Sequence, residues 1–222
     1  MAEMQVKSKK RVVDHGEVFT AEREVKAMCD LVKQETERIE SRFLEPACGN
    51  GNFLAEVLSR KLAVVKKRYG KSCAEYEKYA VLAVSSLYGV DILEDNVTEC
   101  RERLYAIWDK AYSAVLRDRA DTCCRDAVQF ILSRNILCGD ALTMLKSDGS
   151  PIVFAEWSLV SGDLIKRRDF ELNELLSGHK KQMTLDMIGW EYDEEIKGFI
   201  PLPVAEYPLV SYTEVHHAEL YS

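Results

Sequence analysis

The sequence lacks a long hydrophobic run and lacks the pattern of an export signal. No stretch of its 222 residues approaches the roughly 20 consecutive apolar residues that a membrane-spanning helix needs. Residues 1–11 are polar and basic and have no apolar centre, so we expect no secretory signal peptide. These absences predict a cytoplasmic protein that does not contact a membrane.

The sequence also lacks the cysteine spacing of a metal site or a disulfide framework. Its seven cysteines are scattered without a C-x-x-C pair, and the adjacent Cys123 and Cys124 suit neither a zinc knuckle nor an ordinary disulfide. We therefore predict no metal site, and we expect reduced thiols that fill space in the core.

An excess of positive charge is missing as well, because the formal net charge is −7. A protein that binds DNA unaided usually carries a basic face. The overall charge argues against strong binding of duplex DNA by this chain alone. It leaves open a local basic groove, or a partner that supplies recognition or catalysis.

Length and composition predict one domain with a substantial core, since 47% of the residues are hydrophobic. We expect residues 1–13 to form an N-terminal tail and residues 14–222 to form the domain. From about residue 187 the pattern changes to short extended pieces. Pro201, Pro203 and Pro208 forbid a central strand there, so we expect loops and edge hairpins.

The most informative stretch is residues 42–54, RFLEPACGNGNFL. It predicts a short buried strand that Pro46 ends, a turn built on Gly49 and Gly51, and a helix that Asn52 caps. Such a turn at the carboxyl end of a strand is where open α/β sheets bind their ligands. The alternative is an ordinary strand-to-helix turn without a ligand.

The chemistry of this turn favours a cationic ligand over a dinucleotide. The dinucleotide fingerprint requires a third glycine where this chain has Leu54. Glu45 precedes the turn and would repel a pyrophosphate, whereas it would attract an amino group. S-adenosylmethionine (SAM), which carries an ammonium and a sulfonium, therefore fits better than NAD.

Short apolar strands alternate with helical patterns along the chain, which predicts an α/β fold with an open, mainly parallel sheet. The expected neighbouring strands are Phe43–Glu45, Tyr88–Ile92, Asn135–Cys138 and Ile152–Ala155. The expected helices span about residues 20–38, 52–68, 72–86, 95–115, 121–133 and 166–176.

Three carboxylates, Glu45, Asp91 and Asp140, each follow one of these strands. The carboxyl ends of parallel strands lie along one edge of a sheet, so we expect the three side chains to be neighbours. Asp91 would accept hydrogen bonds from ribose hydroxyls, Asp140 from an adenine amino group, and Glu45 would face an ammonium. Each acid taken alone is equally well explained as a helix cap or a solvated loop residue.

The combination and order of these motifs resemble the SAM-dependent adenine-N6 DNA methyltransferases, especially the modification subunits of restriction systems. Residues 15–20 (HGEVFT) resemble their N-terminal cofactor motif, residues 44–54 their glycine motif, residues 88–92 (YGVDI) their ribose-binding motif, and residues 138–142 (CGDAL) the motif that contacts adenine. The resemblance implies a Rossmann-like fold with helices on both faces of the sheet, SAM as cofactor and DNA methylation as activity. The residues that it implies in SAM binding are Phe19, Thr20, Glu45, Ala47, Gly49, Gly51, Asp91, Ile92, Asp140 and Ala141.

The family's catalytic motif, Asn or Asp followed by Pro-Pro and Tyr or Phe, does not occur in this sequence. After the fourth expected strand the chain instead has Glu156 and Trp157. In an active enzyme Glu156 would accept hydrogen bonds from the target amino group and Trp157 would stack on the base. The alternative is an acid at a strand end and a core tryptophan.

Three functions therefore remain open. The chain is a methyltransferase with a divergent catalytic site, a non-catalytic SAM-binding subunit or regulator of a catalytic partner, or a methyltransferase of RNA or protein.

Overall fold

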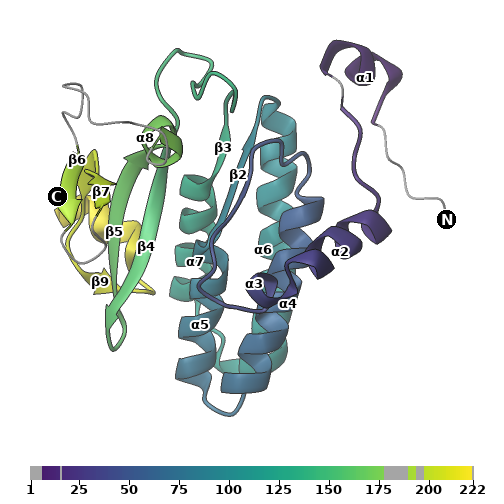
Figure 1. The fold of residues 1–222 in the computed structure, drawn as a ribbon. Helices are drawn as coiled ribbons and strands as arrows, with labels where there is room; N and C mark the ends of the chain where they lie inside the picture. Colours follow the sequence, from purple (N-terminus) through teal and green to yellow (C-terminus); the bar gives the residue numbers. More distant parts are fainter. Residues whose placement is uncertain (1–6, 16, 178–189, 194–197, 222) are drawn as a thin grey trace.

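Three parallel strands form the centre of the fold (Figure 1). The computed structural model describes residues 7–15, 17–177, 190–193 and 198–221. Glu45 pairs with Gly89 and Asp91 pairs with Cys138, so the middle strand, β2, joins the other two in register. The predicted α/β class and the parallel pairing of these three strands are confirmed. The strands are β1 (Phe43–Glu45), β2 (Leu87–Asp91) and β3 (Ile136–Cys138).

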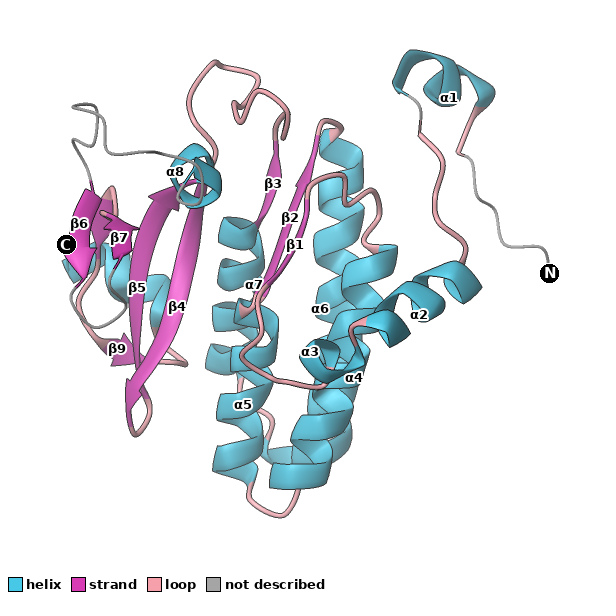
Figure 2. Cartoon of the chain, in the orientation of Figure 1, coloured by secondary structure: helices cyan, strands magenta, loops and turns pink. Residues whose placement is uncertain are grey.

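Four long helices pack together over one face of this sheet (Figure 2). Each carries an apolar stripe that becomes buried, and the rings of Trp108 and Tyr112 stack at 4.5 Å in their shared core. Fully burying one large apolar side chain contributes about 1.5–3 kcal/mol, so this face dominates the stability of the fold. The helices are α4 (Asn52–Tyr69), α5 (Cys73–Ser85), α6 (Glu94–Leu116) and α7 (Thr122–Asn135).

Alternate residues of β2 point to opposite faces of the sheet. Leu87 packs into the helical core, whereas Tyr88 and Val90 pack with Phe154 and Leu172 on the other side. The only helix described on that second side is α8 (Leu172–Ser177), which has six residues. Helices were expected on both faces, and the structure has four long helices on one face and this short helix on the other.

The fourth expected strand forms, but it does not join the parallel sheet. It is β4 (Val153–Ser161), which pairs in antiparallel register with β5 (Leu164–Glu171). Gly162, with φ of 57°, makes the tight turn between them. The helix predicted over residues 166–176 was therefore wrong for its first half, because cross-strand pairing with β4 overrides the helical spacing of the charged side chains.

The C-terminal region consists of short strands, as its prolines predicted. A two-stranded antiparallel sheet forms from residues on both sides of a gap in the described chain, and two further short strands pair with the edge of β5. The expected extended residues 187–189 lie outside the described residues. The elements are β6 (Trp190–Asp193), β7 (Gly198–Pro201), β8 (Ala205–Glu206), β9 (Val210–Ser211) and the 3₁₀ helix η2 (Val215–Tyr221).

The N-terminal segment is attached to the domain at two side chains. Part of the expected tail belongs to helix α1, and Lys7 and Arg11 form ion pairs with Asp95 near the start of α6. The helix expected over residues 20–38 is divided in two. The three helices are α1 (Lys9–His15), α2 (Glu22–Leu31) and α3 (Lys33–Thr36), and a 3₁₀ turn, η1 (Arg117–Arg119), follows α6.

Lys61 is a fully buried cation that joins α4 to two loops at the amino edge of the sheet. Its Nζ donates to the backbone oxygens of Ile39 and Ser41 and to the Ser86 hydroxyl. Burial lowers the pKa of Lys61 to about 7. The three acceptors match the three N–H groups of an ammonium, so they favour the protonated form.

The seven cysteines are free, and the expected role as core residues holds for the four that are buried, whereas Cys123 is exposed. No helix among the described residues has both the length and the apolar character needed to cross a membrane. Nor do the described residues hold a group of three or more His, Cys, Asp or Glu side chains that would bind a metal ion.

Candidate functional site: an acidic cavity at the carboxyl edge of the sheet

The glycine turn between β1 and α4 has a backbone that other residues would strain. Gly49 and Gly51 have φ values of 50° and 82°, in the left-handed region. A Cβ on Gly49 would lie 3.0 Å from the Phe19 ring, and one on Gly51 would lie 2.6 Å from the Cys100 sulfur. The turn therefore needs glycine for its conformation and for the close approach of both neighbours.

The cap predicted for α4 was wrong. Gly51 occupies the N-cap position, and Asn52 is the first residue of the helix. The Asn52 amide instead donates to the backbone oxygen of Thr20 at 3.0 Å. This bond holds the segment that contains Phe19 and Thr20 against the glycine turn. Ala21 occupies the N-cap position of α2.

Asp91, at the end of β2, anchors the glycine turn. Its Oδ2 accepts from the Gly49 N–H at 2.9 Å, and its Oδ1 accepts from the Leu93 N–H at 2.9 Å and from the Asn96 amide at 3.2 Å. One donor belongs to the glycine turn and the other two lie at the start of α6, so one carboxylate holds the turn and this helix end together.

A cavity of about 710 Å³ opens at this edge of the sheet. Nine of the ten residues expected to contact SAM line it, and only Gly51 does not, although it belongs to the same turn. The carboxyl ends of the parallel strands, the glycine turn and the segment before α2 thus meet at one place. The nine residues are Phe19, Thr20, Glu45, Ala47, Gly49, Asp91, Ile92, Asp140 and Ala141.

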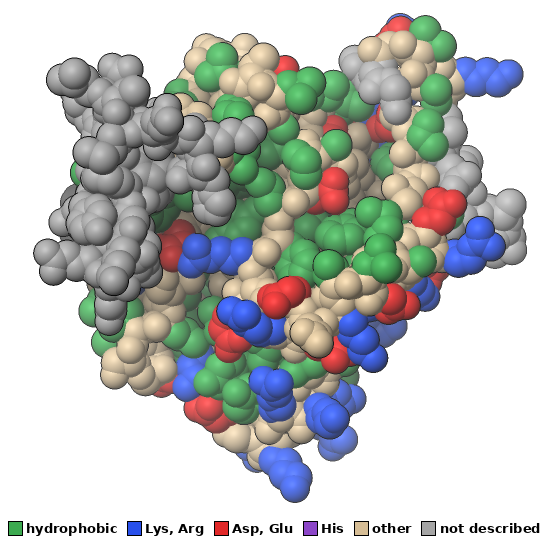
Figure 3. Space-filling model, viewed as in Figure 1, with side chains coloured by type: hydrophobic (Ala, Val, Ile, Leu, Met, Phe, Trp, Pro, Cys, Tyr) green, Lys and Arg blue, Asp and Glu red, His purple; other side chains and the backbone are tan. Residues whose placement is uncertain are grey.

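Among the described residues, the charged side chains that line the cavity are all acidic: Glu17, Glu45, Asp91 and Asp140. Glu17 is paired with Arg11, whereas the other three form no ion pair with a described residue. Burial raises the pKa of Glu45, while a hydrogen bond from the Ala47 backbone opposes the change. A cation beside Glu45 would therefore offset the cost of burying this carboxylate. In Figure 3 a group of Lys and Arg side chains lies at the lower end, over the ends of α4 and α5, and others lie at the right, toward α1 and α2.

Sequence reasoning did not identify three polar residues of this cavity. Asn96 is 1% exposed and donates to both Glu17 and Asp91, at 2.7 and 3.2 Å. Burial opposes ionisation of Glu17, but hydrogen bonds from Arg11 and Asn96 bring its pKa below the usual value. The Asn50 Oδ1 is buried and has no hydrogen-bond partner among the described residues. Glu17 and Asn50 lay inside the recognised motifs, whereas Asn96 had only the sequence signature of a helix cap.

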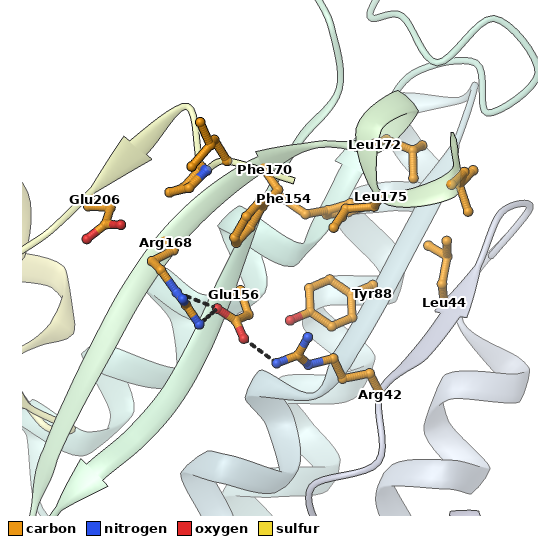
Figure 4. Close-up of a pocket in the computed structure, with 13 residues that line it drawn as sticks. Arg42, Leu44, Tyr88, Phe154, Glu156, Arg168, Phe170, Leu172, Leu175 and Glu206 are labelled. Atoms are coloured by element: carbon orange, nitrogen blue, oxygen red, sulfur yellow. Dashed lines mark hydrogen bonds and ion pairs between the residues drawn. The ribbon is translucent and has the colours of Figure 1, made fainter. Parts of the chain in front are cut away.

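The structure does not bring Glu156 and Trp157 to this cavity. Strand β4 begins beside Gly139, at the carboxyl edge of the parallel sheet, and runs to the opposite edge, where Glu156 pairs with Arg42 (Figure 4). Arg42 precedes β1, whereas the glycine turn follows it. Glu156 therefore lies away from the residues expected to contact the cofactor, because β4 runs against the parallel strands, and its role as an acceptor for the target amino group stays a prediction.

Trp157 points to the other side of β4 and is only 5% exposed. Its indole N–H donates to the Asn135 side chain at 3.2 Å, and its ring meets Phe130 edge-on at 6.3 Å. The alternative stated for this residue, a core tryptophan, is what the structure contains. A stacking role on a substrate base would require Trp157 to leave the core.

Comparisons with known proteins add no assignment. No protein-family model, no curated protein and no solved structure matches this chain.

Proposed function

We propose that this chain binds SAM in the acidic cavity. The observation that carries the proposal is the meeting of nine motif residues around one cavity whose only charged lining side chains, among the described residues, are acids. Its volume lies within the roughly 300–1,000 Å³ typical of cofactor sites. The acids suit a ligand with an ammonium and a sulfonium, and they oppose a pyrophosphate.

In this proposal each group of the ligand has a partner of matching chemistry. Glu45 faces the methionine ammonium, and Asp91 accepts from the ribose hydroxyls. Phe19 and Ile92 pack against the adenine, and Asp140 accepts from its amino group. Bound SAM supplies an electrophilic methyl group, and the role of these residues is to hold and orient it.

We further propose that the α/β domain is a divergent, Rossmann-like relative of the SAM-dependent adenine-N6 DNA methyltransferases of restriction systems, acting in the cytoplasm. The order of the motifs supports this, as does the parallel sheet whose carboxyl edge bears them. DNA is then the substrate class, with RNA or protein as the alternatives that the same cofactor chemistry allows.

A specific observation favours a second candidate, a SAM-binding subunit that supports a catalytic partner. Glu156 is held by two arginines at the far edge of the sheet, and Trp157 is held in the core. Neither is placed to act on a substrate beside the cavity. The isolated chain should therefore bind SAM and transfer its methyl group weakly or not at all.

Calorimetric titration of the purified chain with SAM tests the binding, and NAD serves as the control ligand. We expect saturable binding of SAM and none of NAD. Transfer of a labelled methyl group to DNA, RNA and protein then distinguishes the candidates. The Glu156→Gln variant should bind SAM like the natural chain. No SAM binding would refute the proposal, and robust methylation would refute the second candidate.

A further inference from the structure

A second cavity, of about 470 Å³, lies between the other face of the parallel sheet and the β4–β5 hairpin (Figure 4). Its walls are mostly apolar and include Leu44, Tyr88, Phe154, Phe170 and Leu172. The Tyr88 and Phe154 rings meet edge-on at 5.3 Å, and the Tyr88 hydroxyl is already bonded to the backbone oxygen of Ala155. Such walls offer a ligand apolar and aromatic surface and no free hydroxyl from Tyr88.

One side of this cavity carries a cluster of two arginines and one carboxylate. Glu156 is 13% exposed, and its Oε2 accepts from Arg168 at 2.8 and 2.9 Å while its Oε1 accepts from Arg42. Figure 4 shows both guanidinium groups converging on this carboxylate. The cluster therefore has a net charge of +1.

The fourth charged residue of the lining does not change this balance. Glu206 forms an ion pair with Lys166 at 3.0 Å, so its charge is compensated outside the cavity. Each guanidinium has five N–H donors in a planar fork. Beyond the bonds to Glu156, neither the Arg42 nor the Arg168 guanidinium group has a hydrogen bond to another described residue, so N–H donors remain for a ligand.

We propose that this second cavity binds a small amphipathic monocarboxylate, whose apolar body rests on the aromatic and aliphatic walls and whose carboxylate accepts from Arg42 and Arg168. A planar fork of donors matches a carboxylate in geometry. A single negative charge neutralises the cluster, whereas a doubly charged phosphate would exceed it and meet the Glu156 carboxylate. A few placed polar groups beside apolar walls are typical of small-molecule sites.

This site is separate from the acidic cavity in place and in chemistry. Arg42 lies before β1 and Glu45 lies at its end, so the arginine cluster and the acidic cavity lie at opposite edges of the sheet, and the two cavities share no lining residue. In these proposals the second cavity takes an anion and the acidic cavity takes a cation. Binding of the acid therefore does not depend on whether the chain binds SAM.

Calorimetry of the full chain with octanoate, 3-phenylpropanoate, butanoate and octan-1-ol tests the proposal. We expect at least one of the two larger acids to bind, at least tenfold more tightly than butanoate and than octan-1-ol, because neither control offers both an apolar body and a charge. Binding of neither larger acid would overturn the proposal. Equal affinity for the alcohol would overturn the role of the arginines, and equal affinity for butanoate that of the apolar walls.

Two variants locate the ligand. Arg42→Gln and Arg168→Gln each leave Glu156 with one arginine partner, so we expect both chains to fold, as thermal unfolding will check. Each should weaken binding of the larger acid at least tenfold. Arg23→Gln, on the exposed surface of α2, is the matched control and should bind the acid normally. If neither cavity variant weakens binding, or if SAM displaces the acid, the ligand lies elsewhere and the proposal is wrong.

Discussion

The Asp91→Ala variant gives the most demanding test of the acidic cavity, because one side chain holds three donors there. It accepts from two backbone N–H groups and one amide. Hydrogen bonds to a charged group contribute about 1.5–3 kcal/mol each when fully shielded. Asp91 is only half-buried, and water in the cavity can replace the lost acceptor in part. We therefore expect a loss of about 2–4 kcal/mol in the free energy of unfolding.

Urea denaturation at equilibrium measures this loss, and for a chain of this size it corresponds to a fall in Tm of roughly 5–15 °C. The matched control is Asp140→Ala, because the Asp140 side chain accepts only from the Leu142 N–H, in an exposed turn, among the described residues. The control should lose about 1 kcal/mol or less. If the two variants were equally stable, Asp91 would not anchor the glycine turn.

The same variant tests the proposed ligand. Asp91→Ala removes the acceptor for two ribose hydroxyls, so SAM affinity should fall at least tenfold, measured by calorimetry at a temperature where the variant remains folded. Unchanged affinity would refute the placement of the ribose, even if the expected loss of stability were found.

Three further predictions follow from the same geometry. Burial raises the pKa of Glu45 above its ordinary 4.5. At pH values between the unfolded and the folded pKa, the Glu45 carboxyl is protonated in the folded chain and ionised in the unfolded chain. The contribution of Glu45 to stability therefore falls as the pH rises through this window. SAM affinity should rise through the same window in calorimetric titrations, and Glu45→Gln should remove the pH dependence; a flat profile in the natural chain would contradict the contact. Gly49→Ala should cost about 1–2 kcal/mol in urea denaturation, because φ is positive and the new Cβ meets Phe19, and a neutral effect would disprove the left-handed conformation of the turn. The pKa of Lys61 is lowered to about 7 in the folded chain, so the unfolded chain binds more protons between pH 7 and 10.5. The free energy of unfolding should therefore rise with pH over this range, by at most about 1.4 kcal/mol per pH unit. Lys61→Met should abolish that slope and destabilise the chain at every pH, since it leaves three oxygens without a donor, and a slope that persists would assign it to another group.

Several features followed from local sequence because local physics decides them. A short apolar run that ends at a proline or an acid has few alternatives to a short buried strand, and residues 43–45 and 87–91 are such runs. Gly49 and Gly51 mark a turn wherever they occur together, since their positive φ values exclude most other residues. The gathering of Glu45, Asp91 and Asp140 at one edge then follows from parallel pairing alone.

Only the tertiary structure decided where the chain after β3 would go. The strand at residues 153–161 was predictable, but its direction and partner depend on a turn at Gly162 and on side chains far away in the sequence. Glu156 forms ion pairs with Arg42 and Arg168, and the Trp157 indole N–H donates to the Asn135 side chain. Such contacts join residues 12 to 114 positions apart, so no local pattern contains them.

The same distinction holds for the two cavities. The acidic cavity was visible in the sequence because its residues belong to turns and strand ends that carry local signatures. The role of Asn96 in this cavity was not predictable. An asparagine near the start of a helix has the same sequence context whether it caps that helix or joins Glu17 to Asp91. The second cavity had no signature at all. It exists because a hairpin packs beside the sheet face that bears Leu44 and Tyr88, and that packing is a property of the whole fold.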